Sequence, residues 1–278
     1  MGLLAALLLA MASRAAGLTT PDQFERLVAF RDATTAKTTN WRDALASWRC
    51  PTAPGNSDGE CDPCGRRPVG NWLHMHCRGN STGWGESGDG TVTGLVTNIH
   101  ITDVNLDGPV PRELCLFEHL REFDIDGGHI TGPIPTWIRD CFPRLEELDL
   151  SYNRLTGTLP PELAQLPLLS EIKIEYNSVV GTIPPEVGSA PRMRRFQVEH
   201  NRMTGTIPQS FRSISSALTQ LLLSHNDFEG DLSMLGASRL MIVSVNDNPR
   251  LCGMVPASVR YAKGYNPANT RLGQPCPA

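Results

Sequence analysis

The 278-residue sequence lacks a hydrophobic segment long enough to cross a membrane. Its apolar run at residues 3–12 has half the roughly 20 residues that a transmembrane helix needs, and no later run approaches that length. We therefore predict no direct membrane span.

An excess of either charge is also lacking, since 25 basic and 29 acidic residues give a formal net charge of −4. Only three of the basic residues are lysines. Without a basic surplus, nothing indicates nucleic acid as a partner. A content of 40% hydrophobic and 19% charged residues excludes a generally disordered chain.

Signatures of catalysis are missing as well. The sequence contains no Ser-His-Asp order, phosphate-binding loop or protein-kinase signature. We predict that the protein is not an enzyme and that it holds no cofactor or metal.

The N-terminal segment has the pattern of a secretory signal peptide. The apolar run at residues 3–12 is followed by small residues that suit cleavage, although no Lys or Arg precedes it. We assign residues 1–17 to the signal and predict a secreted protein in an extracellular, cell-wall-like space. Asn80 lies in an Asn-Ser-Thr sequon and is a predicted glycosylation site.

Glycine and proline are abundant, with 25 and 22 residues respectively, and many of them recur at a fixed period. Residues 148–160 read LDLSYNRLTGTLP, and residues 172–184 read IKIEYNSVVGTIP. Seven copies of this pattern occur, with marker glycines at 108, 132, 157, 181, 205, 230 and 253. A repeat of this length predicts a solenoid in which each turn packs on its neighbours.

These repeats resemble the 24-residue leucine-rich repeat of plant extracellular proteins, including polygalacturonase inhibitors and short receptor-kinase ectodomains without the kinase. The resemblance implies an α/β solenoid: an arc of about seven repeats with a parallel β-sheet on its concave face, a helical N-terminal cap and a disulfide-stapled C-terminal cap. The domains are then a cap at residues 18–91, repeats at 92–256 and a second cap at 257–278.

Three positions in each repeat have a structural explanation. The Asn after the strand, such as Asn153, places a buried amide where it can satisfy the turn's backbone groups. The marker Gly allows a backbone conformation that a Cβ would obstruct, and the Pro starts the return segment without needing an N–H. We expect these residues to build the solenoid rather than to bind a ligand.

The eight cysteines suggest four bridges between neighbours: Cys50–Cys61, Cys64–Cys77, Cys115–Cys141 and Cys252–Cys276. The third pair has geometric support, because Cys115 and Cys141 lie eight and seven residues before equivalent strand positions of adjacent repeats. A zinc site from Cys61, Cys64, His74, His76 and Cys77 is an alternative with the right ligand types.

Polar residues that alternate with the buried strand residues should face the concave side. They include an acidic group and a stripe of Tyr and His, and exposed Tyr is a favoured interface anchor. We predict partner contacts from Asp124, Asp126, Asp149, Tyr152, Lys173, Glu175, Tyr176, Glu199, His200 and His225. The acidic side chains suggest a ligand with basic groups.

The sequence thus predicts a non-catalytic module that recognises a protein or peptide ligand. Two more specific roles stay open: an inhibitor of secreted cell-wall-degrading hydrolases, or a soluble partner of a membrane receptor kinase. A remote third is a glycosidase, because Asp124 and Asp149 should lie about 5 Å apart on adjacent strands. An open sheet, however, offers no pocket that excludes water.

Overall fold

The computed structural model describes residues 75–77, 96–102, 106–110, 112–214 and 216–277. Predictions for the signal segment, the first cap, Asn80, the two N-terminal disulfides and the zinc alternative fall outside the residues or side chains described.

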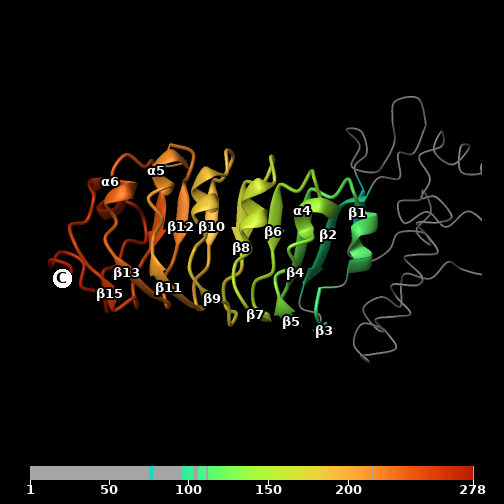
Figure 1. Cartoon of the computed structure of the whole chain (residues 1–278), viewed down its shortest axis with the longest axis horizontal. Helices are drawn as coiled ribbons and strands as arrows, with labels where there is room; N and C mark the ends of the chain where they lie inside the picture. The colour runs from blue at the N-terminus through green and yellow to red at the C-terminus, as the bar shows by residue number, and fades with distance from the viewer. Residues whose placement is uncertain (1–74, 78–95, 103–105, 111, 215, 278) are drawn as a thin grey trace, which may run out of the picture.

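The alternating segments of the seven repeats form seven parallel strands, as predicted. They are β2 (Val96–Thr102), β4 (Glu122–Asp126), β6 (Glu147–Asp149), β8 (Glu171–Lys173), β10 (Arg195–Gln197), β12 (Gln220–Leu222) and β14 (Ile242–Ser244). They lie side by side in chain order, and β1 (Met75–Cys77) pairs antiparallel with β2 at the end of the sheet (Figure 1).

The return half of each repeat forms a second set of short parallel strands that the sequence did not predict. One group is β3 (Asp107–Gly108), β5 (His129–Pro133) and β7 (Arg154–Thr156). The other is β9 (Val180–Gly181), β11 (Arg202–Thr206), β13 (Asp227–Gly230) and β15 (Arg250–Leu251).

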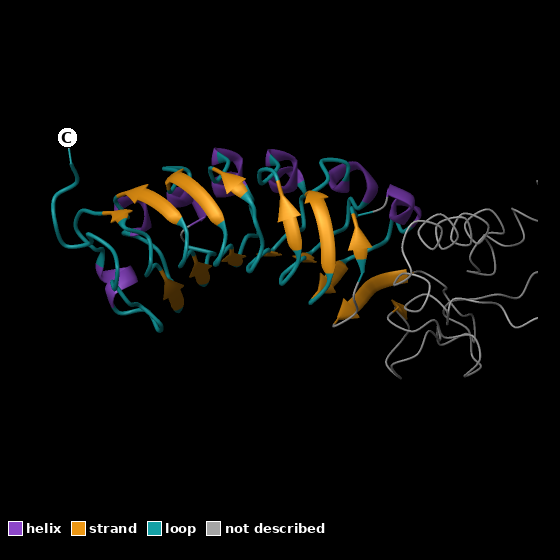
Figure 2. Cartoon of the chain, turned by 90° about the horizontal axis from the view of Figure 1, so that it is seen from below, coloured by secondary structure: helices purple, strands orange, loops and turns teal. Residues whose placement is uncertain are grey.

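Short helical segments complete the turns. They are η1 (Arg112–Leu116), α4 (Ile138–Cys141), η2 (Pro161–Gln165), η3 (Pro185–Ser189), α5 (Phe211–Ile214), η4 (Ser233–Leu235) and α6 (Ala257–Arg260). Prolines start η2 and η3, where a missing N–H costs no hydrogen bond. The turns follow one another along a curved arc, with the helical segments along one side (Figure 2).

The core is a continuous apolar stack inside the solenoid. Equivalent strand residues such as Phe123, Leu148 and Ile172 are fully buried, and the same holds for their counterparts in the later repeats. Each turn therefore buries its apolar residues against the turns before and after it, as the resemblance implied.

A row of asparagines, which we call the asparagine ladder, connects adjacent repeats by hydrogen bonds. Asn201 accepts a hydrogen bond from the backbone N–H of Val179 at 2.9 Å and donates to the carbonyl of Ile174 at 2.9 Å, both in the preceding repeat. Asn153, Asn177, Asn226 and Asn248 make equivalent bonds. The predicted structural role of this Asn is confirmed.

The marker glycine is required by both backbone conformation and space. Gly205 has φ 77°, and a Cβ built there would lie 2.7 Å from Cγ2 of Thr182 in the preceding repeat. A substitution would thus be strained and also clash.

Both disulfides in the described part are the predicted ones. Cys115–Cys141 links adjacent turns with a Cα–Cα distance of 4.7 Å. Cys252–Cys276 ties the C-terminal segment to the last repeat, with Cα atoms 5.0 Å apart. The segment also continues the sheet, because Val243 donates to the carbonyl of Lys263.

Candidate functional site

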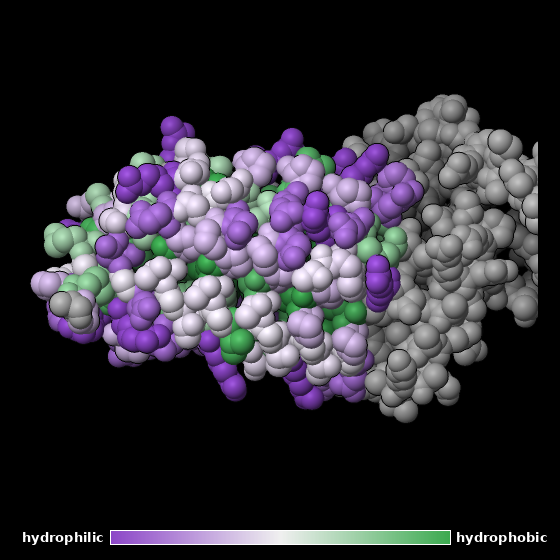
Figure 3. All heavy atoms as spheres, viewed as in Figure 1, coloured by the Kyte–Doolittle hydropathy of each residue, from purple (hydrophilic) through white to green (hydrophobic). Residues whose placement is uncertain are grey.

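The strand registers align three of the predicted contact residues, Asp124, Asp149 and Lys173, in one straight column of the sheet. His100, Asp124, Asp149, Lys173, Gln197, Leu222 and Ser244 are direct neighbours on successive strands. Each column residue alternates with a buried core residue, which turns it to the opposite face of the sheet. On the face seen in Figure 3, hydrophilic side chains gather over β4, β6 and β8.

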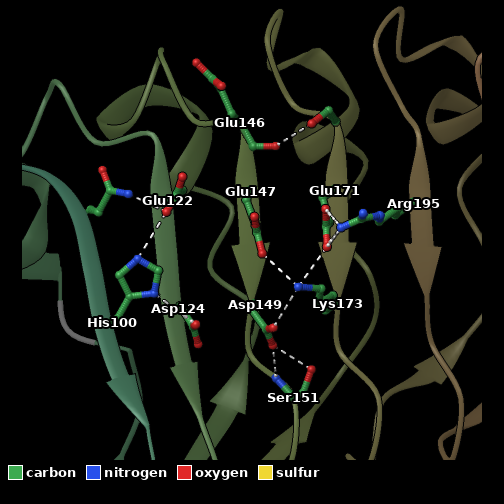
Figure 4. A network of polar contacts seen from close by, with 12 residues as sticks. His100, Glu122, Asp124, Glu146, Glu147, Asp149, Ser151, Glu171, Lys173 and Arg195 are labelled. Atoms are coloured by element: carbon green, nitrogen blue, oxygen red, sulfur yellow. Dashed lines mark hydrogen bonds and ion pairs between the residues drawn. The ribbon is translucent and has the colours of Figure 1, made fainter. Parts of the chain in front are cut away.

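Lys173 is the centre of an ion network on β6 and β8 (Figure 4). Its Nζ lies 2.8 Å from Glu147 Oε1, 2.8 Å from Glu171 Oε1 and 3.4 Å from Asp149 Oδ2. Burial opposes its charge, but the hydrogen bonds to Glu147 and Glu171 raise the Lys173 pKa well above its ordinary value. Lys173 therefore stays charged and neutralises the middle of the face.

Arg195 adds a second cation at the edge of this network, with Nη1 2.9 Å from Glu171 Oε2. The buried side chain of Glu171 is thus shared between Lys173 and Arg195. These contacts hold the carboxylates of β6 and β8 in fixed positions.

The negative charge of the acidic strand β4 is less fully neutralised than that of β6 and β8. His100 lies 3.1 Å from Glu122 Oε2 and 3.2 Å from Asp124 Oδ2, and Asn98 also donates to Glu122. The hydrogen bond to Asp124 is the main cause that raises the His100 pKa. Asp124 Oδ1 is buried without a hydrogen-bond partner among the described residues.

The predicted solvent exposure of Asp149 and of several other concave-face residues is wrong. Asp149 is only 9% exposed, because Lys173 covers one oxygen and the backbone N–H and hydroxyl of Ser151 bond the other at 3.0 and 2.6 Å. Ser151, Gln197 and Ser224 are buried as well. Asp149 therefore binds neighbouring side chains and has little surface exposed to solvent.

Two further acids line the middle of the face. Glu199 accepts hydrogen bonds from the hydroxyls of Ser224 at 2.6 Å and Ser244 at 2.8 Å. Burial raises the pKa of Glu175, whose Oε2 has no hydrogen-bond partner among the described residues. Glu175 is thus a candidate acceptor for a ligand donor.

The predicted aromatic stripe is a continuous stack of rings, which we call the ring ladder: Tyr152, Tyr176, His200 and His225. Successive centroids are 4.4, 4.0 and 3.9 Å apart, with interplanar angles of 12–15°. Tyr152 and Tyr176 are 51% and 43% exposed. At the far end, His225 Nε2 lies 3.3 Å from Asp247 Oδ2.

The ladder rests on an unusual backbone conformation that the sequence analysis missed. All four residues have φ between 51° and 56°, and so does Asp247. Each of these residues directly precedes one of the asparagines that bond adjacent repeats. A residue other than glycine in the left-handed conformation costs about 1–2 kcal/mol of conformational free energy. The inter-repeat hydrogen bonds and the stacking, about 0.5–1.5 kcal/mol per pair, offset that strain.

The sequence analysis also missed one column of the face: Asn98, Glu122, Glu147, Glu171, Arg195 and Gln220. These residues lie two positions before the column of His100, Asp124 and Asp149. Continuing the same period-two alternation toward the start of each strand would have found them.

The described residues include no group of three or more His, Cys, Asp or Glu side chains arranged for a metal ion. The expected pair Asp124 and Asp149 does occupy adjacent strands, but each carboxylate is engaged by its own neighbours, His100 and Lys173. Within the same residues, no helix combines the length and hydrophobicity that a membrane crossing needs.

Comparison with known proteins identifies the repeat. Residues 118–179 match the family model described as leucine rich repeat. A probable leucine-rich-repeat receptor-like serine/threonine-protein kinase of Arabidopsis thaliana is 39% identical over 72 residues, which are 26% of this chain and 8% of the relative. The chain thus matches less than a tenth of that relative's length.

Solved plant ectodomains share the fold. The ectodomain of the Arabidopsis receptor kinase HAESA, in complex with an N-terminally extended IDA peptide hormone, is 25% identical with a TM-score of 0.67, covering 86% of this chain and 35% of that one. The Arabidopsis BIR2 ectodomain is 26% identical with a TM-score of 0.56, covering 75% and 94%. The fold is a leucine-rich-repeat solenoid, and the resemblance to plant extracellular proteins of this type is confirmed.

Proposed function

We propose that this protein is a non-catalytic recognition module that binds an extended peptide along its concave face. The observation that carries the proposal is the ring ladder of Tyr152, Tyr176, His200 and His225. It is an exposed row of stacked aromatic side chains that lies beside a row of carboxylates. Rigid aromatic side chains give large contact area at a small entropic cost.

The dimensions of the face favour a peptide over a folded protein. Seven strands about 4.8 Å apart span roughly 34 Å, and five residues give a width of about 16 Å. The resulting area of about 550 Å² is below the roughly 800 Å² per partner of a standard protein interface. An extended peptide of about ten residues spans the same 34 Å. The IDA peptide in the HAESA complex supports this choice.

The charge of the face favours a basic ligand. Its carboxylates include Glu122, Asp124, Glu147, Glu175 and Glu199, whereas Lys173 and Arg195 are the cations that the described network contains. A cationic peptide would be attracted to this surface and oriented on it.

We also propose that the protein acts outside the cell. The disulfides Cys115–Cys141 and Cys252–Cys276 support this, because bridges persist in oxidising compartments. A second candidate role is association with a membrane receptor. The match to the BIR2 ectodomain, which covers 94% of that chain, supports this role, because an ectodomain is the outer part of a membrane-anchored protein.

The test selects nine-residue random peptides displayed on phage against the full-length protein. We expect selected peptides to lose at least tenfold in affinity for a Tyr176→Ala, His225→Ala variant, which removes two rings of the ladder. The matched control removes the same residue types elsewhere, with Tyr261→Ala in the C-terminal cap and His129→Ala on β5, and should bind normally. Equal binding by both variants would show that the concave face is not the site.

A further inference from the structure

The ring ladder changes its chemistry halfway along. Its first two rings are the phenols of Tyr152 and Tyr176, and its last two are the imidazoles of His200 and His225. The imidazoles are stacked with centroids 3.9 Å apart and planes inclined by 15°. A phenol stays neutral below about pH 10, whereas an imidazole takes up a proton near about pH 6.5. The histidine end of the ladder can therefore change its charge under mildly acidic conditions.

The backbone position that carries the rings continues beyond the last imidazole to Asp247. The N–H of His200 donates to the carbonyl of Ser224, just before His225, and the N–H of His225 donates to that of Asn246, just before Asp247. Asp247 has the same left-handed backbone, with φ 55°. It thus occupies the next rung with a carboxylate in place of a ring, and its Oδ2 lies 3.3 Å from His225 Nε2.

Two amides hold this carboxylate in place. Asn269 donates to Oδ1 of Asp247, and Asn246 donates to Oδ2. These hydrogen bonds lower the pKa of Asp247, so it stays ionised over the range in which imidazoles titrate. The ion pair that it forms within the described part of the chain is the one with His225. A positive charge on that ring is consequently stabilised.

The inner imidazole has a less favourable environment for a charge. His200 lies between the rings of Tyr176 and His225, and burial lowers its pKa, with a charge on His225 as the next cause. The acids that act in the opposite direction are Glu199 and, more distantly along the ladder, Asp247. Like charges this close repel each other, and more strongly in a partly buried site than in water. The pair therefore accepts one proton readily, on the ring beside Asp247, and resists a second.

We propose that His200 and His225 form a one-proton switch, which weakens the binding of a cationic peptide to the ring ladder as the solution is acidified. The proton comes from solvent and adds to the unprotonated ring nitrogen of His225. It places a positive charge on the row of rings that the peptide contacts, so proton and peptide compete for the same surface. This inference rests on the proposed peptide-binding face and adds its regulation.

The proton uptake can be tested without a ligand, in an NMR pH titration of the seven histidine rings of the full-length protein. Single His→Phe changes assign the signals. We expect His200 and His225 to titrate in separate steps, with His200 second. His225→Phe keeps a stacked ring but removes the like charge, so the midpoint of His200 should rise by about 0.7 pH units. A His200 midpoint that ignores this change would overturn the switch.

The effect on binding is measured with one cationic nine-residue peptide from the phage selection, at pH 7.5 and pH 5.5. The wild type should bind more weakly at pH 5.5. The variant His200→Phe, His225→Phe keeps two stacked rings that cannot take a proton, so its loss of affinity between the two pH values should be about fivefold smaller. The matched control is His129→Phe on β5, since His129 also lies beside a carboxylate, that of Asp107 at 3.6 Å. It should keep the full wild-type loss.

The outcomes separate this inference from the proposed function. A peptide that depends on Tyr176 and His225, yet loses the same affinity on acidification in the wild type and in the double phenylalanine variant, would overturn the switch and leave the peptide-binding face standing. Failure to select any peptide sensitive to the Tyr176→Ala, His225→Ala variant would overturn both.

Discussion

Replacing Asn201 by alanine removes one rung of the asparagine ladder and tests what holds the face in register. In the folded protein, Asn201 Oδ1 is the acceptor for the N–H of Val179. Its Nδ2 donates to the carbonyls of Ile174, Val198 and Glu199. After the change, Ile174 keeps a bond from Asn177, Val198 keeps one from Asn226, and Glu199 keeps one from the N–H of Tyr176. The N–H of Val179 is therefore the group left without a partner.

The expected cost follows from this count. An orphaned buried donor costs about 1–3 kcal/mol, and the three carbonyls that lose one of their bonds add the smaller net value of lost hydrogen bonds. We expect Asn201→Ala to lower the free energy of unfolding by about 2–4 kcal/mol. Urea denaturation followed by circular dichroism, with the disulfides intact, should show a lower midpoint at an unchanged slope.

A matched truncation provides the control. Asn266 also accepts a hydrogen bond from a backbone N–H, that of Ala268, but it lies exposed in the C-terminal cap where water can replace it. Asn266→Ala should cost about 0.5 kcal/mol or less. If both variants lost the same stability, the buried amide would not be what sustains the repeat-to-repeat backbone.

Three further predictions concern charge and the cap. Lys173→Met leaves its three carboxylate partners facing one another, so it should cost about 2 kcal/mol at pH 7 and recover toward the wild type at pH 5, as urea midpoints at both values would show. The raised His100 pKa means that its stabilising contribution is complete below pH 6.5 and is lost as the pH rises through the folded-state pKa. Asp124→Asn should move that pKa downward in an NMR titration, and an unchanged value would refute the assigned cause. Replacing both Cys252 and Cys276 by alanine opens a loop with a sequence separation of 24 and should cost about 3 kcal/mol in the same urea assay.

The architecture was predictable because its physical cause repeats in the sequence. Period-two alternation at Leu148 and Leu150 marks a strand with one buried face, and Asn153 marks the turn that follows. Seven copies reinforce one another, so the strand order and the register follow from simple alignment. The Cys115–Cys141 bridge followed from the same alignment.

The chemistry of the face was less predictable, because it depends on contacts between repeats. The repeat pattern shows that Asp149 is an acidic residue on a strand, but its burial arises from contacts with Lys173 and Ser151. The stripe of Tyr and His was visible in the sequence, whereas its stacking requires a left-handed backbone that tyrosine rarely adopts.

The most direct test of the peptide-binding face uses the four tyrosines of the chain as reporters. Tyr152 and Tyr176 lie in the ring ladder, whereas Tyr261 and Tyr265 lie in the C-terminal cap. Full-length protein labelled with ¹³C in its tyrosine rings should give four signals, assigned by single Tyr→Phe changes. Titration with a selected peptide should shift the signals of Tyr152 and Tyr176 and leave those of Tyr261 and Tyr265 in place. Shifts confined to the cap tyrosines would contradict the account.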